Sequence, residues 1–252
     1  MQKSSNWKRP MWHALGPILT IVGVGLLALS PLGYRMGWFG ISVALLRLIP
    51  LGVIACGLGL VASLAAMMRT PAGAGPSAWI VPVVAIVVCI AVAIVPIAGI
   101  AHARQVPSIH DITTDTEMPP VFVALAADRS VAPNGMDYGG AEVAAAQKRG
   151  YPDLTTMYSK LTPDALFDRA QQAAQQCGWR LADADRKDLR IEAVDTSVLY
   201  GFKDDIVVRI RADAGGSRMD VRSASRVGRS DLGVNAARIR RYLQRLTQMQ
   251  SG

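Results

Sequence analysis

The sequence predicts a membrane protein with an α+β outer domain: three N-terminal transmembrane helices, then a soluble domain in which two helices pack on a four-stranded, mostly antiparallel sheet. Composition is the first observation, because 51% of the 252 residues are hydrophobic and only 18% are charged. This excludes a disordered, fibrous or purely soluble chain. Charge distribution is the second observation. Residues 1–100 hold six Lys or Arg and no acid, whereas residues 101–252 hold 21 Lys or Arg and all 19 acids. The second part is therefore nearly neutral, and we expect no binding of nucleic acid.

Three apolar stretches are long enough to cross the hydrocarbon core of a bilayer, which takes about 20 helical residues. They lie at residues 14–32, about 45–68 and 80–100, within a predicted transmembrane region of residues 14–100. The first stretch follows basic residues, as the apolar part of a signal peptide does. Its length, and the position of Pro31 directly after the candidate cleavage residue Ser30, favour a helix that is retained.

The orientation follows from the excess of Lys and Arg in the short cytoplasmic loops of membrane proteins. A cytoplasmic N-terminus over residues 1–13 places the larger basic group inside the cell, namely Lys3, Lys8, Arg9 and Arg69. Three spans then carry residues 101–252 to the far side. The chain has neither a glycosylation sequon nor a eukaryotic targeting signal. We therefore expect a multi-pass protein of the bacterial inner membrane with a periplasmic C-terminal domain.

The outer part is predicted to begin with an extended, Pro- and Gly-rich segment over residues 101–160, with one short helix near 141–149. A compact α+β domain over residues 161–252 follows. Its first helix is predicted to start at Pro163, with Thr162 as the N-cap. The four strands are predicted at residues 179–184, 189–200, 205–212 and 218–227.

The final helix is predicted to begin after Gly228, with Ser230 or Asp231 as its cap. Its expected core face consists of Leu232, Ile239, Tyr242, Leu243 and Leu246. Arginines on the other side leave this helix basic. Contact with anionic lipid headgroups is one expectation for that side, and a solvated surface is the other.

The last two strands form a predicted hairpin, because Gly215 and Gly216 suit a two-residue primed turn. The residue numbers of facing partners then add to 431, which pairs Arg209 with Arg222. Two like charges directly opposite each other are destabilising. One interpretation is that an anion binds between the two arginines; the other is that Asp220, diagonal to Arg209, neutralises the pair on a solvated face.

Four segments of the outer part resemble a known family. The first segment, residues 222–235, reads Arg-Ser-Ala-Ser-Arg-Val-Gly-Arg-Ser-Asp-Leu-Gly-Val-Asn and precedes Arg238-Ile239-Arg240. The other three segments are Lys203-Asp204-Asp205-Ile206-Val207, Ile109-His110-Asp111-Ile112-Thr113-Thr114-Asp115 and Pro119-Pro120-Val121-Phe122. They are similar to the domain of unknown function 1499, and the resemblance covers roughly residues 105–248. It implies a domain that often follows membrane segments. It implies almost nothing about activity, because the family is named for the lack of a known function.

Two interpretations of the signature at residues 222–238 are open. In the first, Ser223 and other polar residues of the turn converge with arginines on an anionic ligand, because exposed N–H groups at a helix start favour anions. In the second, the glycines permit a tight turn, Ser230 or Asp231 caps the helix, and Arg226 pairs with Asp205. Together with the hairpin pair, the candidate ligand-binding residues are Arg209, Arg222, Ser225, Arg226, Ser230, Asp231, Asn235 and Arg238.

The sequence has no phosphate loop, no dinucleotide-binding glycine pattern and no Cys-x-x-Cys. We expect no catalytic residues, no cofactor and no metal, since His110 with the scattered acids Asp111, Asp115 and Glu117 lacks metal-ligand spacing.

The leading hypothesis for function is a non-enzymatic cell-envelope module that binds a partner protein, a lipid or an anionic glycan, with the lipid bilayer as its surroundings. The alternative is an envelope hydrolase or transferase with a site near the turn at residues 225–235, around Ser225, Arg226, Ser230, Asp231 and His110. Transport is a third hypothesis. It requires a homo-oligomer, because three spans without an acid offer no ion pathway within one chain.

Overall fold

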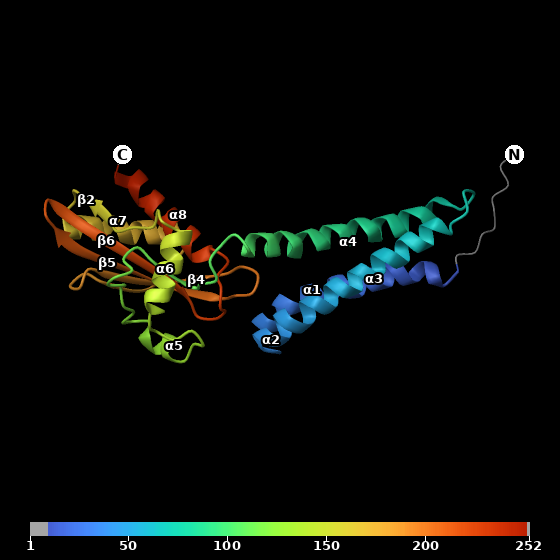
Figure 1. The fold of residues 1–252 in the computed structure, drawn as a ribbon, viewed down its shortest axis with the longest axis horizontal. Helices are drawn as coiled ribbons and strands as arrows, with labels where there is room; N and C mark the ends of the chain where they lie inside the picture. The colour runs from blue at the N-terminus through green and yellow to red at the C-terminus, as the bar shows by residue number, and fades with distance from the viewer. Residues whose placement is uncertain (1–9, 251–252) are drawn as a thin grey trace. The chain divides into compact units, whose positions relative to one another are not determined.

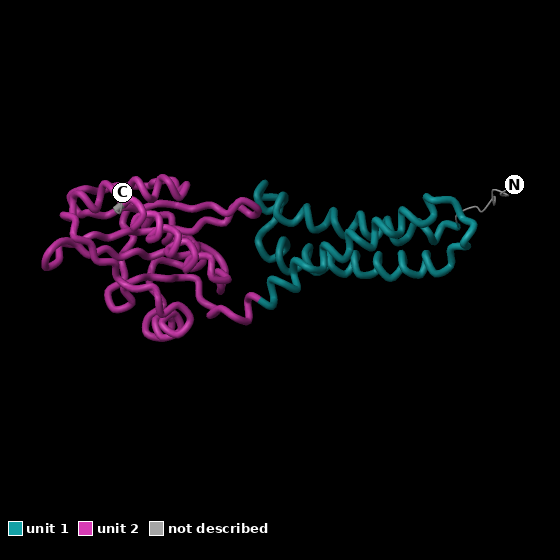
Figure 2. The backbone as a smooth tube through the Cα atoms, turned by 90° about the horizontal axis from the view of Figure 1, so that it is seen from above, with its two compact units in different colours: residues 1–101 teal, residues 102–252 magenta. Residues whose placement is uncertain are grey.

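The computed structural model describes residues 10–250, and the chain divides into two compact units, residues 1–101 and 102–252 (Figure 2). The first unit contains the long apolar helices and the second contains the sheet. Residues 1–9 of the predicted cytoplasmic N-terminus lie outside the described residues.

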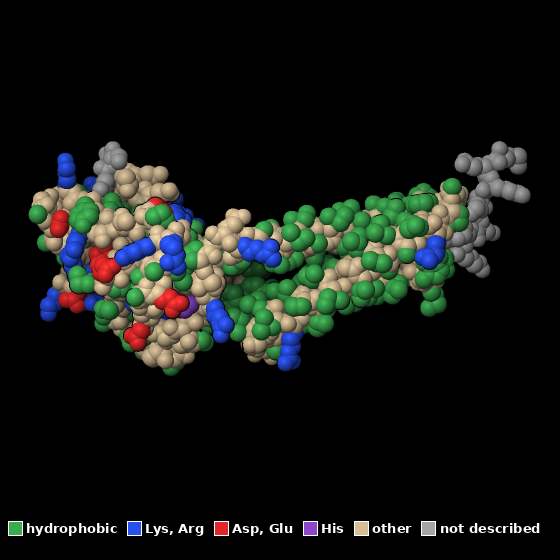
Figure 3. Space-filling model, in the orientation of Figure 1, with side chains coloured by type: hydrophobic (Ala, Val, Ile, Leu, Met, Phe, Trp, Pro, Cys, Tyr) green, Lys and Arg blue, Asp and Glu red, His purple; other side chains and the backbone are tan. Residues whose placement is uncertain are grey.

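Three helices of the first unit are long and apolar enough to cross a membrane, which confirms the predicted spans in number and approximate position. The middle one combines α2 (Ile41–Val43), a π-helical segment (Ala44–Leu48) and α3 (Ile49–Met68), and the others are α1 (Trp12–Arg35) and α4 (Pro76–Ala103) (Figure 1). Hydrophobic side chains cover most of their visible surface, whereas acidic and basic side chains alternate over the second unit (Figure 3).

Helices α1 and α3 approach each other closely along a stripe of small residues. A Cβ atom added at Gly23 would lie 2.7 Å from the carbonyl oxygen of Gly52, and one added at Gly59 would lie 3.0 Å from the carbonyl oxygen of Gly16. Lipid tails are as apolar as Leu, so membrane helices associate mainly through such close van der Waals packing. This pair therefore forms the best-packed contact within the first unit.

The second unit is an α+β domain built on one antiparallel sheet of six strands, so the prediction of four strands is wrong. The strand order is β1-β6-β5-β4-β3, and β2 also pairs with β6. The two additional strands, β1 and β2, come from the Pro- and Gly-rich segment. Each has three residues, too few to show an alternating pattern. The strands are β1 (Asp111–Thr113), β2 (Met157–Ser159), β3 (Arg180–Asp185), β4 (Arg190–Thr196), β5 (Lys203–Asp213) and β6 (Gly216–Ser225).

Two of the four helices of this unit lie along one face of the sheet (Figure 1). Their buried side chains, such as Phe167 and Tyr242, share an apolar cluster with inward residues of the strands, such as Ile206. The hydroxyl of Tyr242 donates to the carbonyl oxygen of Ala170 at 3.0 Å and so joins the two helices. The helices are α5 (Ala126–Ser130), α6 (Gly140–Gly150), α7 (Pro163–Gln176) and α8 (Val234–Gln250), and α7 and α8 are the two on this face.

The sequence predicts the start of α7 correctly but not the start of α8. Helix α7 begins at Pro163 after Thr162, as predicted, and the Thr162 hydroxyl accepts a hydrogen bond from the N–H of Ala165. Helix α8 begins only at Val234. Leu232, predicted in its core face, lies before the helix with a positive φ of 53° and is exposed.

The hairpin of β5 and β6 has a different register from the predicted one. Asp213 pairs with Gly216, so the turn residues are Ala214 and Gly215, and facing residue numbers add to 429. Gly216 is required by β2 rather than by the turn, because a Cβ atom there would lie 2.1 Å from the carbonyl oxygen of Ser159. A glycine selected by close packing of another strand thus resembles a turn residue in the sequence.

This shift of two residues preserves the face of every side chain but changes its partner. Arg209 faces Asp220 and not Arg222, so the predicted pair of like charges is wrong. The like-charge pair of the observed register is Arg211 with Arg218, one step nearer the turn on the same face.

Candidate functional site

The face of the sheet opposite α7 and α8 carries charged side chains, and residues 114–139, here named the covering segment, contact much of it. The charged residues of β1, β4, β5 and β6 share this face because successive residues of a strand point to opposite faces and these residues are separated by even numbers of positions within each strand. We name this the charged face; its members are Asp111, Arg190, Glu192, Asp205, Arg209, Arg211, Arg218, Asp220 and Arg222.

Arg222 lies at one end of the charged face and is almost fully buried. Its Nε donates to Asp111 Oδ1 at 3.0 Å and its Nη2 to Asp111 Oδ2 at 2.7 Å, a bidentate pair between β6 and β1. The guanidinium also donates to the carbonyl oxygens of Pro120 and Met136 in the covering segment, at 3.1 and 2.8 Å. Arg222 is therefore a structural link between the sheet and the covering segment.

Asp205 is fully buried and accepts from two arginines. Arg129 Nη1 lies 3.1 Å from Asp205 Oδ2, and Arg226 donates to both carboxylate oxygens at 2.8 to 3.1 Å. Arg226 also contacts the exposed Asp128 at 2.9 Å. Burial lowers the pKa of Arg129 although the carboxylate of Asp205 opposes that change. The second interpretation of the signature, in which Arg226 pairs with Asp205, therefore describes the structure.

Phe122 of the covering segment lies between the two buried arginines. The guanidinium carbons of Arg129 and Arg222 are 4.7 and 4.9 Å from its ring centroid, within the range of cation–π attraction. Phe122 also packs with Val207 and Ala224 in a small apolar cluster on this face. The ring therefore excludes water from the ion pairs beneath the covering segment.

Glu192, which is fully buried, fixes the next part of the covering segment. Its carboxylate accepts from the backbone N–H groups of Val123, Ala124 and Leu125 at 2.8 to 3.0 Å. Arg190 Nε donates to the same carboxylate at 3.0 Å. Three backbone donors and one guanidinium thus compensate this buried charge.

Arg209 lies near the centre of the charged face and contacts two carboxylates. Its Nη2 is 2.9 Å from Asp115 and 2.9 Å from Asp220. Asp220 also accepts from the hydroxyls of Thr114 and Thr156, at 3.3 and 2.6 Å. The arginine proposed from the sequence as an anion site is therefore neutralised by the protein itself, and in a largely buried setting rather than on the predicted solvated surface.

Arg211 and Arg218 complete the charged face and differ from the other arginines on it. They face each other across β5 and β6, both are half-buried, and neither has an ion-pair or hydrogen-bond partner among residues 10–250. Arg211, with Arg190 and Arg209, lines a cavity of about 240 Å³. Pro119, Val121 and Val123 of the covering segment form its apolar wall, and Asp188 is its one acidic lining residue, so the lining is net basic.

A second cavity of about 200 Å³ lies on the other side of the same segment and shares Pro119 and Val121 with the first. Tyr138 and Arg222 supply polar groups to its wall. Within the described part of the chain the hydroxyl of Tyr138 is buried without a hydrogen-bond partner. Burial, with a smaller effect of the Asp111 carboxylate, raises the pKa of Tyr138 to about 12, so this hydroxyl is a neutral donor at physiological pH.

The remaining predicted site residues lie at the joint between β6 and α8. Asn235 Nδ2 donates to the hydroxyl of Ser225 at 3.0 Å, and the hydroxyl of Ser223 donates to Asn235 Oδ1 at 2.6 Å. Arg238 binds Asp204 at 2.6 Å and Asp195 at 2.8 Å. Ser225, Asn235 and Arg238 therefore do converge, but on one another, and they attach α8 to the sheet.

Asp231 and Ser230 serve the turn before α8. Asp231 accepts from the N–H groups of Gly233 and Asn235 at 2.8 and 2.9 Å, and the Ser230 hydroxyl accepts from the N–H of Leu232 at 3.2 Å. Burial raises the pKa of Asp231. These contacts are those of capping groups.

The residues of the alternative enzyme hypothesis form no catalytic arrangement in the described chain. The hydroxyl of Ser225 is engaged by Asn235, and the ring Nδ1 of His110 is buried without a partner among the described residues. The backbone N–H of Ser225 donates to the carbonyl oxygen of His110 at 2.9 Å. Among the described residues, however, the His110 ring makes no hydrogen bond to the side chain of Ser225, Ser230 or Asp231, whereas a nucleophile needs a base within hydrogen-bond reach. Nor do residues 10–250 contain a group of three His, Cys, Asp or Glu side chains placed to hold a metal ion.

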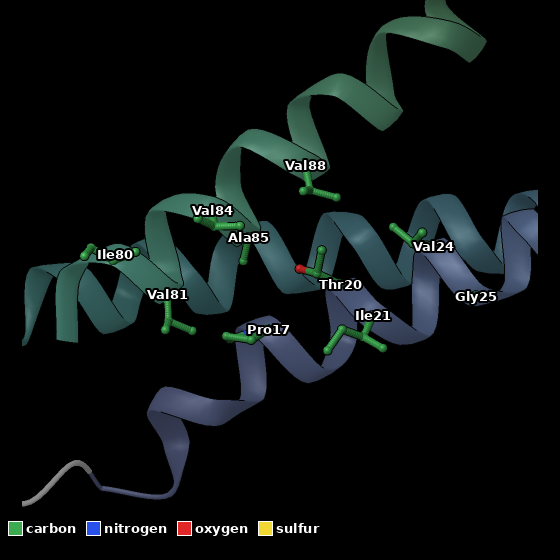
Figure 4. Close-up of a pocket in the computed structure, with 10 residues that line it drawn as sticks. All are labelled: Pro17, Thr20, Ile21, Val24, Gly25, Ile80, Val81, Val84, Ala85 and Val88. Atoms are coloured by element: carbon green, nitrogen blue, oxygen red, sulfur yellow. The ribbon is translucent and has the colours of Figure 1, made fainter. Parts of the chain in front are cut away.

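A further cavity, of about 640 Å³, lies between α1 and α4 in the first unit (Figure 4). Thr20 is the one lining residue with a polar side chain, and its hydroxyl is within 3.3 Å of Cys89 Sγ. This cavity offers apolar contact without an ionisable group. Specific recognition needs a few convergent polar groups, so the cavity beside Arg211 is the stronger candidate for a ligand site.

Sequence reasoning missed Arg129, Glu192, Tyr138 and the pair of Arg211 with Arg218. The available signal is the alternation of charges along three adjacent strands, at residues 190–192, 205–211 and 218–222. Such alternation indicates a second face that is either solvated or covered by an ionic layer. It does not reveal which segment covers that face.

Comparisons with known proteins add one finding. The sequence model of the family described as "Protein of unknown function (DUF1499)" matches residues 111–246, from β1 to the last turns of α8. No curated protein and no solved structure matches the chain. The match spans more than half of the chain and includes every strand of the sheet. The chain therefore belongs to this family, as a member with three apolar helices ahead of the family domain.

Proposed function

We propose that the protein is a membrane-anchored, non-enzymatic binding module that takes an anionic ligand in the cavity lined by Arg211, which Arg218 faces across β5 and β6. The observation that carries the proposal is that these two half-buried arginines face each other without a carboxylate partner among residues 10–250. The other arginines of the charged face, Arg190, Arg209 and Arg222, each contact at least one acid.

Electrostatics favours an anion at this position. Two guanidinium groups directly opposite each other on adjacent strands repel, and partial burial reduces their screening by water. A phosphate or carboxylate between them would relieve the repulsion and accept charge-assisted hydrogen bonds, each contributing roughly 1.5–3 kcal/mol. Arg209 and Arg190 add to the positive potential of the same cavity, although acids neutralise both in part.

The cavity wall restricts the ligand further. Pro119, Val121 and Val123 present apolar surface beside the arginines, and Val121 and Val123 are more than half exposed. A ligand with an anionic group next to an apolar part fits this combination. A phospholipid headgroup with its glycerol backbone and an anionic glycan attached to lipid share this chemistry.

The cellular setting is part of the proposal. The excess of Lys and Arg near the N-terminal side supports a bacterial inner membrane protein with its N-terminus in the cytoplasm and residues 102–252 in the periplasm. A ligand of the envelope, and not a nucleic acid, would then reach the cavity.

Native mass spectrometry of the full chain, released from nanodiscs made with the lipids of its own cell, tests the proposal. The wild type is compared with Arg211→Gln/Arg218→Gln and with the matched control Arg241→Gln/Arg245→Gln, which removes two exposed arginines of α8. We expect a retained anionic species whose occupancy falls at least about tenfold in the first variant and stays unchanged in the control.

The mass of the retained species distinguishes a phospholipid from a glycan. Equal occupancy in wild type and in Arg211→Gln/Arg218→Gln would overturn the proposed site. An apo mass with a copurifying protein would replace it with a protein-binding role.

A further inference from the structure

The covalent link between the two units limits how far one edge of the sheet lies from the membrane. Helix α4 ends at Ala103 and β1 begins at Asp111, so residues 104–110 form the whole connection. Seven residues span at most about 25 Å even when fully extended. Because α4 is a candidate span, the start of β1 is covalently tethered within this distance of the end of that span.

Two loops share this edge of the sheet, here named the membrane edge. Asp111 pairs with Ala224 near the end of β6, and Asp204, near the start of β5, pairs with Ser225. The membrane edge therefore includes the β4–β5 loop at residues 197–202 and the turn between β6 and α8 at residues 226–233.

Large apolar side chains are exposed on both loops. Val198 is 89% exposed and Leu199 is 64% exposed, next to each other in the β4–β5 loop. Leu232 and Val234, in and just after the second loop, are also exposed. Single exposed hydrophobic residues are ordinary, but a group at one edge marks an interaction surface.

The charges of the membrane edge favour an anionic partner. Arg104, Lys203 and Arg229 are exposed and have no ion pair among the described residues. The acids of this edge are already engaged: Asp195 and Asp204 with Arg238, Asp128 with Arg226, and Asp231 with backbone N–H groups. A basic residue near the surface of an anionic membrane contributes roughly 1 kcal/mol of attraction.

We propose that the membrane edge docks on an anionic lipid surface, with Val198 and Leu199 inserted among the headgroups and Lys203 and Arg229 against lipid phosphates. The occupant is the bilayer that holds α4, because the seven-residue linker tethers this edge within reach of it. The inference uses the membrane helices and the linker, and it is independent of the cavity beside Arg211.

Two labelled positions at opposite ends of β5 test the proposal. An environment-sensitive fluorophore is attached to Leu199→Cys or, as the matched control, to Ala214→Cys in the β5–β6 turn, with the native Cys56, Cys89 and Cys177 replaced by Ala. Because β5 has 11 residues and a strand rises about 3.3 Å per residue, the control lies roughly 35 Å from the membrane edge. The full chain is reconstituted in vesicles of phosphatidylcholine and phosphatidylglycerol that carry a headgroup-level quencher.

We expect a blue shift and at least twofold quenching at position 199, and neither at position 214. Emission typical of water at both positions would overturn the proposal, and so would a blue shift at 199 without lipid quenching, which indicates burial against protein. Lys203→Gln/Arg229→Gln should weaken the quenching at 199 in phosphatidylglycerol vesicles but not in pure phosphatidylcholine.

A measurement on the unlabelled wild type guards against misfolding of the Cys variants. Amides of residues 197–202 should exchange hydrogen more slowly in phosphatidylglycerol vesicles than in a zwitterionic detergent. Equal exchange in both would also overturn the proposal.

Discussion

The two faces of the sheet are buried by different chemistry. On one face, α7 and α8 cover side chains such as Ile206, Val208 and Val221 with apolar surface. On the other face, the covering segment lies over ion pairs such as Arg222 with Asp111, and only a small apolar cluster around Phe122 accompanies them. Asp205 and Ile206 are neighbours in β5 and show both modes, since they point to opposite faces and both are fully buried.

Of the two faces, the charged face is better suited to specific recognition. Apolar burial is non-directional and roughly proportional to area, so the α7 and α8 face stabilises the domain without demanding particular partners. Buried ion pairs depend on geometry, because a charge that loses its partner in a dry site costs several kcal/mol. Most charges of the charged face therefore have a fixed partner. Arg211 and Arg218, which have no ion pair within the described part of the chain, are the exception.

The largest effect should come from removing the shared carboxylate of the charged face. Asp205→Ala leaves Arg129 without its acid and removes the bidentate partner of Arg226, so we expect a loss of about 3–5 kcal/mol in the free energy of unfolding. The midpoint of urea unfolding of the full chain in micelles, at constant slope, measures it. Asp128→Ala is the control, because that exposed partner of Arg226 should contribute less than about 1 kcal/mol. Equal effects of the two variants would contradict the ionic account of this face.

A smaller effect is expected from the neighbouring position on the apolar face. Ile206→Val removes one methylene group from a fully buried side chain, and the expected loss is about 0.5–1.5 kcal/mol. The same urea midpoint measures it. A loss as large as that of Asp205→Ala would show that the apolar face is as sensitive to detail as the charged face, which would remove the contrast between them.

The smallest effect should come from replacing Arg129, one of the two arginines that contact Asp205. Arg129→Met keeps the packing against Phe122 and leaves Asp205 paired with Arg226. Arg129 Nε and Nη2 are buried without partners among the described residues, so this guanidinium is poorly compensated. Replacing such a charge with an apolar side chain is often neutral or stabilising, and we expect a change within about 1 kcal/mol of zero. A loss above about 3 kcal/mol would mean that Arg129 is required to neutralise Asp205.

Residue patterns predicted the parts of the fold that depend on local physics. Hydropathy and length located the three spans, and the cap, proline and apolar spacing located α7. Alternation placed each residue of β5 and β6 on its correct face. The six-stranded sheet was not predictable in this way, because β1 and β2 are short strands defined by their pairing with β6 and not by their own sequence.

The candidate site shows the same division. Residue type and two-residue periodicity are local properties, so they were enough to predict a charged strand face and a polar strand-to-helix turn. Which of these charges are neutralised depends on contacts that form only in the folded domain. Gly216 packs closely against β2 and lies outside the two-residue turn, so the observed register differs by two residues from the predicted one. In the observed register Arg209 faces Asp220, and Arg211 faces Arg218. Register and partner choice depend on contacts between segments far apart in the chain, and no local pattern encodes them.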